Sequence, residues 1–354
     1  MNPSIRKHLQ ESSSAWLITG VAGFIGSHIL ETLLLHGQQV VGLDDFSTGR
    51  RENLTEVRRL VGEGFWKNFR LIEGDISDPI CCKEAVQSCR YVLHQAALGS
   101  VPQSITNPEL THRVNDSGFL NILVAAKEAR VRQLVYASSC AVYGNTVNLP
   151  LAESFTPSPM SPYAASKACN ETYAQAFFSA YGLKSLGLRY FNVFGERQDP
   201  NGSYAAVIPR WIDMALRGDC ININGDGLQT RDFIYVKNIV SANISAALHA
   251  SDKDCGVINV GSGNQTTLID LLSLLQLGLR KHGLIDRIPE IRSFPDRPGD
   301  IRFSQADITR YHEFLSPKDI PIEEGLERTI LWYADKIAFA NTAVRTKPSE
   351  FQTY

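Results

Sequence analysis

A glycine-rich turn between a short apolar run and a longer apolar segment is the feature that most constrains the fold of this chain. The turn is Gly20-Val-Ala-Gly23-Phe-Ile-Gly26, and it follows the apolar run Ala15–Thr19. Glycines at this spacing permit a tight turn from a strand into a helix that lies close against the strand. The helix N-terminus then presents backbone amides that stabilise a negative charge such as a pyrophosphate. A glycine-rich turn without a ligand is the simpler alternative, which residues further along the chain must exclude.

The first half of the chain alternates short apolar runs with helix-length amphipathic segments. Repeated strand–helix alternation predicts parallel strands joined by right-handed crossovers. Apolar runs without strict alternation fit strands that are covered on both faces. We therefore expect an α/β fold with a doubly wound parallel sheet of the Rossmann type. The expected strands are Ala15–Thr19, Gln39–Leu43, Phe69–Glu73, Tyr91–His94, Leu134–Ser138 and Ser185–Arg189, and the first expected helix is Gly23–His36.

The sequence changes in character after the sixth expected strand. From Asn192 onward it contains more Pro, Gly and Asn and less regular apolar runs. This change predicts a smaller, discontinuous α/β domain that closes over the C-terminal edge of the sheet. Segments Pro200–Gly225 and Ile285–Ile301 are expected to be loop-rich, and Leu268–Lys281 is expected to form a long amphipathic helix. The predicted boundaries are residues 14–191 with about 230–262 for the first domain, and residues 192–229 with about 263–345 for the second.

Composition argues against several classes of function. The formal net charge of −2 over 354 residues gives no reason to expect nucleic acid or an anionic membrane as a partner. No apolar run approaches the roughly 20 residues of a membrane span, and residues 1–14 lack the apolar stretch of a secretory signal. Without paired CxxC spacing or a zinc-ligand pattern, we expect a cytoplasmic protein with reduced thiols and no metal site. The seven cysteines are Cys81, Cys82, Cys89, Cys140, Cys169, Cys220 and Cys255.

Acidic residues at the ends of the second and third strands extend the nucleotide site. Asp44 ends the second strand, eighteen residues after Gly26, where a carboxylate binds the ribose hydroxyls of an adenosine. An acid there disfavours a 2′-phosphate and favours NAD over NADP, although Arg50 and Arg51 close behind leave NADP open. Asp75 ends the third strand, where it could accept from the adenine amino group or cap the next helix.

A tyrosine and a lysine further along the chain suggest a catalytic base. Tyr163 and Lys167 are four residues apart, so they stand one turn apart on the same face of a helix. The ammonium can lower the pKa of the phenol from its ordinary value near 10 towards neutral pH. A lone Tyr-x-x-x-Lys is more often a solvated helix face. Here it follows the glycine turn and two polar strand ends, His94–Ala97 and Ser138–Gly144, in a fixed order, which favours the functional interpretation.

This ordered set of motifs resembles the extended short-chain dehydrogenase/reductases. The resemblance covers roughly residues 16–331, because Arg189–Gly195 and Arg297–Asp300 match further motifs of that superfamily in order. Within the superfamily, the chain is similar to the UDP-hexose 4-epimerases, in the branch that accepts N-acetylated sugars. The resemblance implies tightly bound NAD, a UDP-sugar substrate and a homodimer. The dimer would form through the helices that lead into and contain Tyr163–Lys167.

The resemblance also implies a reversible 4-epimerisation, an isomerase reaction without net oxidation or reduction. Tyr163 would take the proton of the sugar 4-hydroxyl, Ser139 would bind the 4-oxygen and relay the proton, and Lys167 would bind the nicotinamide ribose. The C4 hydride would pass to NAD⁺, and it would return to the opposite face after the 4-keto sugar has rotated. The implied catalytic residues are Ser139, Tyr163 and Lys167, and the implied cofactor-binding residues are Gly20, Gly23, Phe24, Ile25, Gly26, Asp44, Asp75, Ile76, Gln95, Ala96, Tyr163 and Lys167.

Residues 140 and 141 separate this reaction from others of the superfamily. The sugar-nucleotide dehydratases carry an Asp-Glu pair at these two positions, and the UDP-glucuronate decarboxylases carry a Glu at the second. Dehydration needs an acid that expels a hydroxyl, and Cys140 and Ala141 cannot supply one. We expect the two side chains to pack beneath the turn.

Arginines and a small residue define the expected sugar-nucleotide site. Guanidinium groups bind phosphate bidentately, so the resemblance assigns Arg231 and Arg297 to the diphosphate, with a surface ion pair as the alternative. Ser304 occupies a position where a bulky Tyr restricts relatives to plain hexoses, so it points to UDP-GlcNAc and UDP-GalNAc. Asn222 stands where relatives often place an aromatic ring against the uracil, which leaves that contact open. The implied substrate-binding residues are Ser100, Ser139, Asn192, Gln198, Val207, Trp211, Asn224, Arg231, Arg297, Asp300 and Ser304.

Two kinds of alternative stay open from the sequence. The first is a related enzyme: an epimerase that acts mainly on UDP-glucose and UDP-galactose or on UDP-acetamido uronic acids, or another sugar-nucleotide chemistry on the same fold. The second is a catalytically silent NAD-binding protein. Ser139, Tyr163 and Lys167 are all present, which disfavours the silent protein because it would need none of them.

Overall fold

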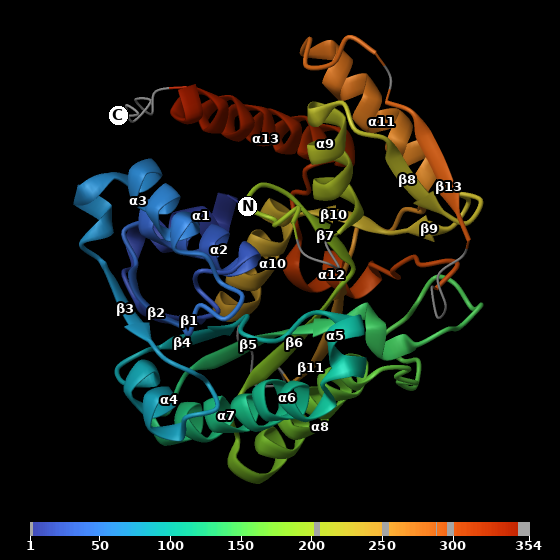
Figure 1. Ribbon diagram of the computed structural model, residues 1–354. Helices are drawn as coiled ribbons and strands as arrows, with labels where there is room; N and C mark the ends of the chain where they lie inside the picture. Colours follow the sequence, from blue (N-terminus) through green and yellow to red (C-terminus); the bar gives the residue numbers. More distant parts are fainter. Residues whose placement is uncertain (1–2, 202–205, 250–254, 288, 296–300, 346–354) are drawn as a thin grey trace, which may run out of the picture. The chain divides into compact units, whose positions relative to one another are not determined.

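A computed structural model describes residues 3–201, 206–249, 255–287, 289–295 and 301–345 (Figure 1). The chain forms two compact units. The first takes the described parts of residues 1–193, 230–266 and 301–320, and the second those of residues 194–229, 267–300 and 321–354. The boundaries expected from the sequence assign residues 301–320 to the second domain. In the structure their backbone is bonded to the first unit, since Leu151 N donates to Gln305 O and Asp307 N donates to Leu151 O.

A seven-stranded sheet forms the centre of the first unit among the described residues. Its order is β11-β6-β5-β4-β1-β2-β3, and the neighbouring strands are parallel. The order reverses beside β1, which is the arrangement of a doubly wound sheet. This confirms the predicted fold class. The strands are β1 Ala15–Thr19, β2 Gln39–Asp44, β3 Phe69–Glu73, β4 Tyr91–His94, β5 Gln133–Ser139, β6 Ser185–Tyr190 and β11 Cys255–Val260.

Helices cover both faces of this sheet (Figure 1). Helices α1, α2, α3 and α10 lie on one face, and α4, α6, α7 and α8 lie on the other. Successive side chains of β1 alternate between two cores, because Trp16 and Ile18 belong to one apolar cluster and Leu17 belongs to the other. The helices are α1 Pro3–Glu11, α2 Phe24–Leu35, α3 Arg51–Trp66, α4 Pro79–Val86, α5 Val101–Thr106, α6 Pro108–His112, α7 Gly118–Glu128, α8 Pro162–Tyr181 and α10 Val236–Leu248.

Short elements complete the first unit. A π-helical turn, η1, joins α6 to α7, and a 3-10 turn, η2, follows β5 directly. Strand β7 pairs with β10, and β9 pairs with β12. Their bounds are η1 Arg113–Ser117, η2 Cys140–Tyr143, β7 Asn192–Phe194, β9 Thr230–Arg231, β10 Phe233–Tyr235, β12 Thr266–Thr267 and α12 Thr309–Leu315.

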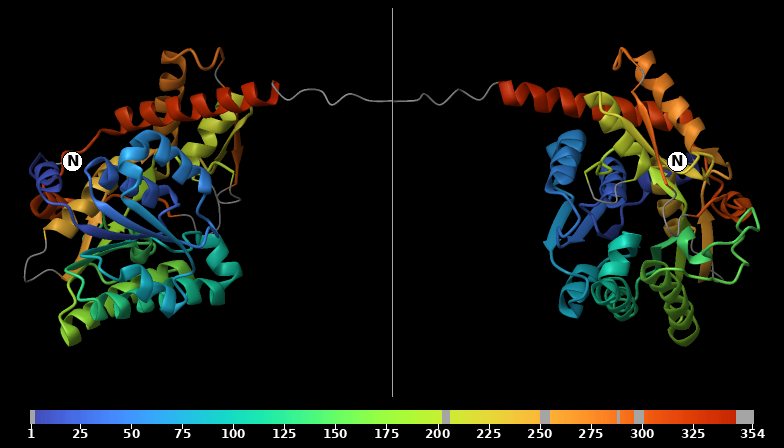
Figure 2. Two further views of the ribbon diagram at one scale, coloured as in Figure 1. Left: turned by 90° about the vertical axis from the view of Figure 1, so that its left-hand side faces the viewer. Right: turned by 45° about the vertical axis from the view of Figure 1, so that its right-hand side comes forward.

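The second unit is built from three helices and a parallel strand pair in its described part. Helices α9 and α11 both pack on the long helix α13 (Figure 2). Helix α11 begins and ends where the sequence predicts. The elements are α9 Val207–Arg217, β8 Ile221–Asn224, α11 Leu268–Lys281, β13 Ile291–Phe294 and α13 Ile322–Arg345.

The expectation of a loop-rich segment over Pro200–Gly225 is wrong, because α9 and β8 lie within it. Helix α9 buries Ile208, Trp211 and Ile212, which recur at helical spacing. Pro209 falls in the first turn of the helix, where a missing N–H loses no intrahelical hydrogen bond. The density of Pro, Gly and Asn around this segment concealed its periodicity. In the segment Ile285–Ile301, residues 288 and 296–300 lie outside the described residues, and the remainder contains β13.

The length and hydropathy of the helices test whether one of them could span a membrane. No helix in the described ranges is both long and apolar enough to pass through a bilayer. Cytoplasmic localisation and homodimerisation stay predictions, because both concern the surroundings of the chain and not its own fold.

Gln38 fastens the N-terminal helix α1 to the sheet. Its side chain is fully buried. The amide nitrogen donates to Leu9 O at 2.7 Å and to Ser12 O at 3.1 Å. The amide oxygen accepts from Ser14 N and from Trp16 Nε1, both at 3.0 Å. One amide therefore satisfies the backbone at the end of α1 and the start of β1 together.

Replacing Gln38→Ala should lower the free energy of unfolding by about 3 kcal/mol, because it leaves several buried donors and acceptors without partners. The adjacent Gln39→Ala is a matched control, since Gln39 is exposed and bonds Asn68 at the surface. It should change the free energy of unfolding by less than about 0.5 kcal/mol. Urea unfolding followed by tryptophan fluorescence measures both variants. Equal losses in the two variants would contradict this role of Gln38.

Candidate active site

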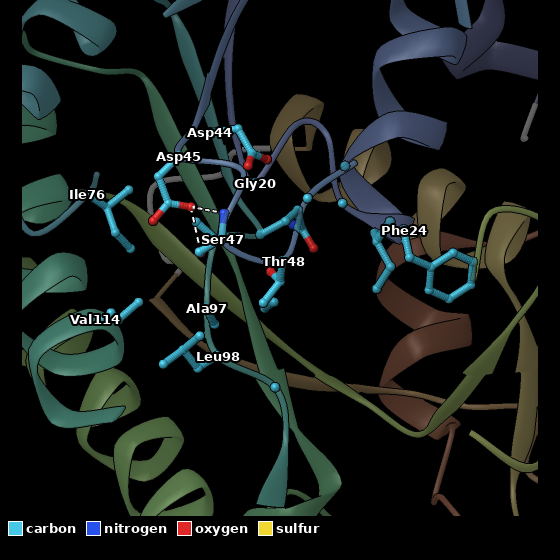
Figure 3. A pocket seen from close by; sticks show the side chains of 18 of the residues that line it. Gly20, Phe24, Asp44, Asp45, Ser47, Thr48, Ile76, Ala97, Leu98 and Val114 are labelled. Atoms are coloured by element: carbon cyan, nitrogen blue, oxygen red, sulfur yellow. Dashed lines mark hydrogen bonds between the residues drawn. The ribbon is translucent and has the colours of Figure 1, made fainter. Parts of the chain in front are cut away.

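A pocket of about 370 Å³ opens at the carboxyl ends of the strands in the first unit (Figure 3). It lies where the strand order reverses, which is the usual ligand position in an open α/β sheet. In Figure 3, Asp44, Ser47 and Thr48 line one part of it, and Ile76 and Val114 form an apolar wall. The residues predicted for catalysis and cofactor binding that line it are Gly20, Gly23, Phe24, Ile25, Gly26, Asp44, Asp75, Ile76, Gln95, Ala96, Ser139, Tyr163 and Lys167.

The glycine turn forms one side of the pocket through close backbone approach. Gly20 has φ +66°, and a Cβ there would lie 2.8 Å from Ala96 N. A Cβ on Gly26 would lie 2.1 Å from Gly20 O. Gly23 precedes α2 and caps it with no side-chain hydrogen bond. The glycines thus let the main chain of the turn pack closely, and the first turn of α2 lines the pocket with no side chain from Gly23 or Gly26, which fits a diphosphate.

Asp44 is buried at the end of β2. Its Oδ2 accepts from Ala22 N at 2.8 Å, and its Oδ1 accepts from Phe46 N at 2.9 Å. Burial raises the pKa of Asp44, and these two backbone bonds oppose the rise. Of the two arginines that left NADP open, Arg50 lies 3.8 Å from Glu52 and Arg51 lies 2.6 Å from Glu73, both in ion pairs at the surface. The Asp44 carboxylate is therefore held in position by backbone amides of the glycine turn and of the residues that follow β2.

Tyr163 and Lys167 lie at the start of α8, whose first turn is capped by Ser161 Oγ accepting from Ala164 N at 3.1 Å. Lys167 is buried, and its Nζ lies 5.9 Å from the ring centre of Tyr163. The same Nζ donates to Ala137 O at 2.8 Å. The predicted placement of Tyr163 and Lys167 on one helix face is confirmed.

The protonation properties of this pair follow from burial. Burial raises the pKa of Tyr163, and a hydrogen bond with Ser139 opposes the rise. Burial also lowers the pKa of Lys167 to about 8, against the opposing charges of Asp116 and Glu171. The expected fall of the Tyr163 pKa towards neutral pH is therefore not found: the net direction is upward, because loss of solvation is the largest influence on the phenol.

Buried polar groups support the floor of the pocket. Burial and the charge of Lys167 lower the pKa of His94 to about 3, so the imidazole is neutral, and its Nδ1 lies 2.8 Å from Thr19 Oγ1. Both ends of the Gln95 amide are fixed: Nε2 donates to Asn243 Oδ1 at 2.9 Å, and Oε1 accepts from Tyr190 OH at 3.1 Å. These bonds hold the end of β4 against α10 and β6.

The sequence analysis missed Asn115, which lies in the π-helical turn η1. Its side chain accepts from Leu98 N at 2.8 Å and donates to Leu98 O at 3.1 Å, and it donates to Ser166 Oγ at 3.1 Å. Such turns are frequent at functional sites. In the sequence, the polar pair Asn115-Asp116 stands just before the apolar segment of α7, and this was the feature that could have indicated a functional residue here. Asn115 itself does not line the pocket; lining residues that were missed include Asp45, Ser47, Thr48, Gly49, Val114, Tyr190, Phe191 and Val193.

The cysteine that follows Ser139 is inert. Cys140 is partly buried and packs against an apolar cluster that includes Val142 and Phe191, as expected from the sequence. Burial raises the pKa of its thiol to about 12. Across the described ranges, no group of three or more His, Cys, Asp or Glu residues could hold a metal ion.

The predicted substrate-binding residues of the first unit are more scattered. Ser139 lines the pocket. Ser100 caps α5, Asn192 begins β7, and Arg231 ends β9. Ser304 is buried, with 5% of its surface exposed.

In the second unit, the predicted residues occupy different elements. Val207 begins α9, and Asn224 ends β8. Trp211 is buried, and its Nε1 donates to Asn222 O at 3.2 Å, so its indole packs within this unit. Gln198 is partly buried in the segment before α9. Arg297 and Asp300 lie outside the described residues.

Asp232, the neighbour of Arg231, organises several of these segments. It is fully buried and accepts from Ser262 N at 2.6 Å, Gly263 N at 2.9 Å and Ala306 N at 3.0 Å. Its carbonyl oxygen accepts from Asn192 N at 2.9 Å. Burial raises the pKa of Asp232, and these hydrogen bonds oppose the rise. The carboxylate thus joins the turn at Ser262–Gly263 to the segment that carries Ser304, and the main chain of Asp232 bonds the start of β7.

Gly20→Ala should destabilise the fold more than Gly37→Ala does. Both glycines have φ near +70° (+66° and +71°), so each substitution carries a left-handed strain of about 1 kcal/mol. Only Gly20→Ala also forces a methyl group against Ala96, which should add roughly 2 kcal/mol, since a Cβ at Gly37 meets nothing within 4 Å. Chemical denaturation of the two variants gives the comparison. Equal destabilisation would contradict the close-approach argument.

Both a family model and individual relatives match this chain. The model of the NAD dependent epimerase/dehydratase family matches residues 16–261. The UDP-glucose 4-epimerase of Mycolicibacterium smegmatis is 34% identical over 323 residues, which cover 90% of this chain and 98% of that protein.

Two solved structures are similar over most of their length. The UDP-N-acetylglucosamine 4-epimerase from Methanobrevibacter ruminantium, in complex with UDP-N-acetylmuramic acid, is 38% identical with a TM-score of 0.84, covering 92% of this chain and 99% of that one. The UDP-glucose 4-epimerase of Thermus thermophilus, in complex with NAD, is 34% identical with a TM-score of 0.78, covering 90% and 98%.

Proposed function

We propose a reversible 4-epimerisation of UDP-N-acetylglucosamine and UDP-N-acetylgalactosamine for this chain, which belongs to the NAD dependent epimerase/dehydratase family. The observation that carries the proposal is that Ser139, Tyr163 and Lys167 line the same pocket as the glycine turn. A base, a relay hydroxyl and a cation then stand beside a dinucleotide cradle. A silent binding protein would need only the cradle.

NAD fits the pocket through features of the chain itself. The diphosphate would lie against the first turn of α2, whose residues Phe24, Ile25 and Gly26 line the pocket. The adenosine ribose would bond Asp44, and an acid at this position disfavours a 2′-phosphate. Lys167 would hold the nicotinamide ribose. When bound, the oxidised nicotinamide supplies the acceptor that takes the sugar C4 hydride and later returns it.

Tyr163 and Ser139 would move the proton of the sugar 4-hydroxyl. Ser139 is hydrogen-bonded to the phenol, so it can relay a proton between the phenol and a sugar oxygen. Burial favours the neutral phenol, and a positive charge nearby, such as Lys167, favours the phenolate that acts as base. The ammonium uses one of its three hydrogens on Ala137 O, which leaves donors for hydroxyl groups. The proton would return to the sugar oxygen as the hydride returns to the opposite face.

The acetamido substrate is supported by two observations. Ser304 is a small residue at the position where, as the family resemblance implies, a Tyr restricts relatives to plain hexoses, and a UDP-N-acetylglucosamine 4-epimerase is 38% identical. Activity on UDP-glucose is the second candidate, favoured by the 34% identity with a UDP-glucose 4-epimerase. Burial raises the pKa of the Cys140 thiol to about 12, so it is too weak an acid to serve as the proton donor in dehydration. The further ligands proposed for the UDP-sugar are Ser100, Asn192, Gln198, Val207, Trp211, Asn224, Arg231, Arg297 and Asp300.

Protein purified without added cofactor should convert UDP-GlcNAc into UDP-GalNAc, seen as a new anomeric proton signal by NMR. Tyr163→Phe should lower kcat by at least about 100-fold, because it removes the base, and should leave bound NAD unchanged. Tyr173→Phe is the control, since Tyr173 is 40% exposed on the same helix. Conversion of UDP-glucose alone would refute the acetamido substrate. Failure of every UDP-sugar, with NAD bound, would overturn the reaction.

Alkaline pH should inactivate the enzyme as Lys167 loses its charge. Its lowered pKa means that the ammonium is present below about pH 8 and lost above it, so kcat should fall as the pH rises through about 8. Lys167→Arg keeps a charge throughout this range, so its remaining activity should lack this alkaline fall. Initial rates between about pH 6 and 10 give both profiles. The same alkaline fall in the two proteins would assign it to another group.

A further inference from the structure

We propose that Glu171 is a positioning residue of this site: its carboxylate joins the end of β5, which carries Ser139, to α8 and faces Lys167 with a negative charge. Glu171 follows Lys167 by four residues, so it lies one turn further along the same face of α8. The inference rests on the proposed function, because it assigns Glu171 a task in that reaction. The sequence analysis gave no role to this residue.

Glu171 is held by two partners of different kinds. Its Oε1 accepts from Ser138 Oγ at 2.6 Å. Arg189, on β6, binds the carboxylate bidentately, with Nε 2.9 Å from Oε1 and Nη2 2.7 Å from Oε2. The side chains of the pair are 3% and 11% exposed. A bidentate pair at this depth is rigid, so the carboxylate occupies a fixed position beneath the catalytic groups.

The bond from Ser138 completes a series of contacts between β5 and α8. Three consecutive residues at the end of β5 each bond a side chain of α8, and these side chains are four residues apart. Because Ser139 immediately follows Ser138, a shift of Glu171 would displace the relay hydroxyl relative to the phenol. The three contacts are Ser139 with Tyr163, Ala137 with Lys167, and Ser138 with Glu171.

Charge gives Glu171 its second task. Lys167 is buried, which disfavours its ammonium, and the anions that oppose this effect are Asp116 and Glu171. The other groups nearby add no anion: His94 is neutral, and burial keeps the Cys140 thiol protonated. The ionisable groups around Lys167 are Tyr163, Cys169 and Glu171 on α8, Asp116 in η1, His94 on β4, Cys140 in η2 and Arg189 on β6.

Glu171 could instead serve only to neutralise Arg189. Glu171→Gln alone would leave a buried guanidinium without its counter-ion, and such changes often unfold a protein. The test therefore uses Glu171→Gln combined with Arg189→Met, which removes both charges of the pair at similar size. Glu171→Asp keeps the charge. Glu128→Gln on α7, which breaks an exposed pair with Lys83, is the control.

Three properties separate the two roles: the pH profile of kcat and KM for UDP-GlcNAc, the NAD bound per chain, and the titration of Lys167 by NMR of ¹³C-lysine protein, assigned with Lys167→Arg. The double variant should keep its NAD and its KM. Its Lys167 should titrate about one pH unit lower, and kcat at pH 8 should fall about tenfold. Glu171→Asp should restore the titration of Lys167. A double variant with the wild-type pH profile and Lys167 titration would overturn the inference.

A smaller change tests the link to β5 if the double variant does not fold. Ser138→Ala removes the hydroxyl that bonds Glu171 and leaves the pair with Arg189 in place. It should lower kcat about tenfold at every pH, with KM unchanged, because Ser139 loses its position relative to Tyr163. Wild-type kcat in Ser138→Ala would overturn the positioning role. If the wild-type protein converts no UDP-sugar, the proposed function fails, and the Lys167 titration still decides the role of Glu171.

Discussion

The close approach of backbone at Gly20, Gly26 and Ala96 is the constraint on which the site depends. A Cβ at either glycine would overlap a neighbouring main chain, so the distance between β1, α2 and β4 is set by the absence of side chains. That distance brings the start of α2 to the sheet edge. It also lets Ala22 N bond the Asp44 carboxylate at the end of β2. The doubly wound strand order then leaves an opening at this edge.

Burial determines the electrostatics of the pocket more than any single charge does. It raises the pKa values of Asp44 and Tyr163 and lowers those of His94 and Lys167. Each of these groups is also hydrogen-bonded, which fixes its position while its charged form is disfavoured. A site of this kind changes its proton affinities strongly when a charged ligand enters. The contacts between β5 and α8 keep the distances fixed while that happens.

Local rules explain what the sequence could predict. The turn glycines, the strand ends and the four-residue spacing of Tyr163 and Lys167 all depend on short-range geometry, and the predicted residues of these motifs line one pocket. Groups defined by packing were missed. Asn115 and Glu171 acquire their partners only when η1, α8, β5 and β6 come together, and the sequence carries little signal for such contacts.

Two wrong expectations have the same origin. The pKa of Tyr163 was expected to follow its charged neighbour, but the extent of burial, which spacing does not report, has the larger effect. The segment that contains α9 was expected to be loop because of its composition, but the buried face of the helix, at Ile208 and Trp211, decides its structure. In both cases, burial in the folded protein had a larger effect than the local sequence pattern.

The central claim is that the sugar C4 hydride leaves and returns within this pocket without net oxidation. UDP-GlcNAc deuterated at C4 tests it directly, with the isotope followed into UDP-GalNAc by mass spectrometry in ordinary water. The account predicts that the product keeps its deuterium and that no free NADH accumulates. Loss of the deuterium to solvent, or oxidised sugar formed in step with NADH, would contradict it.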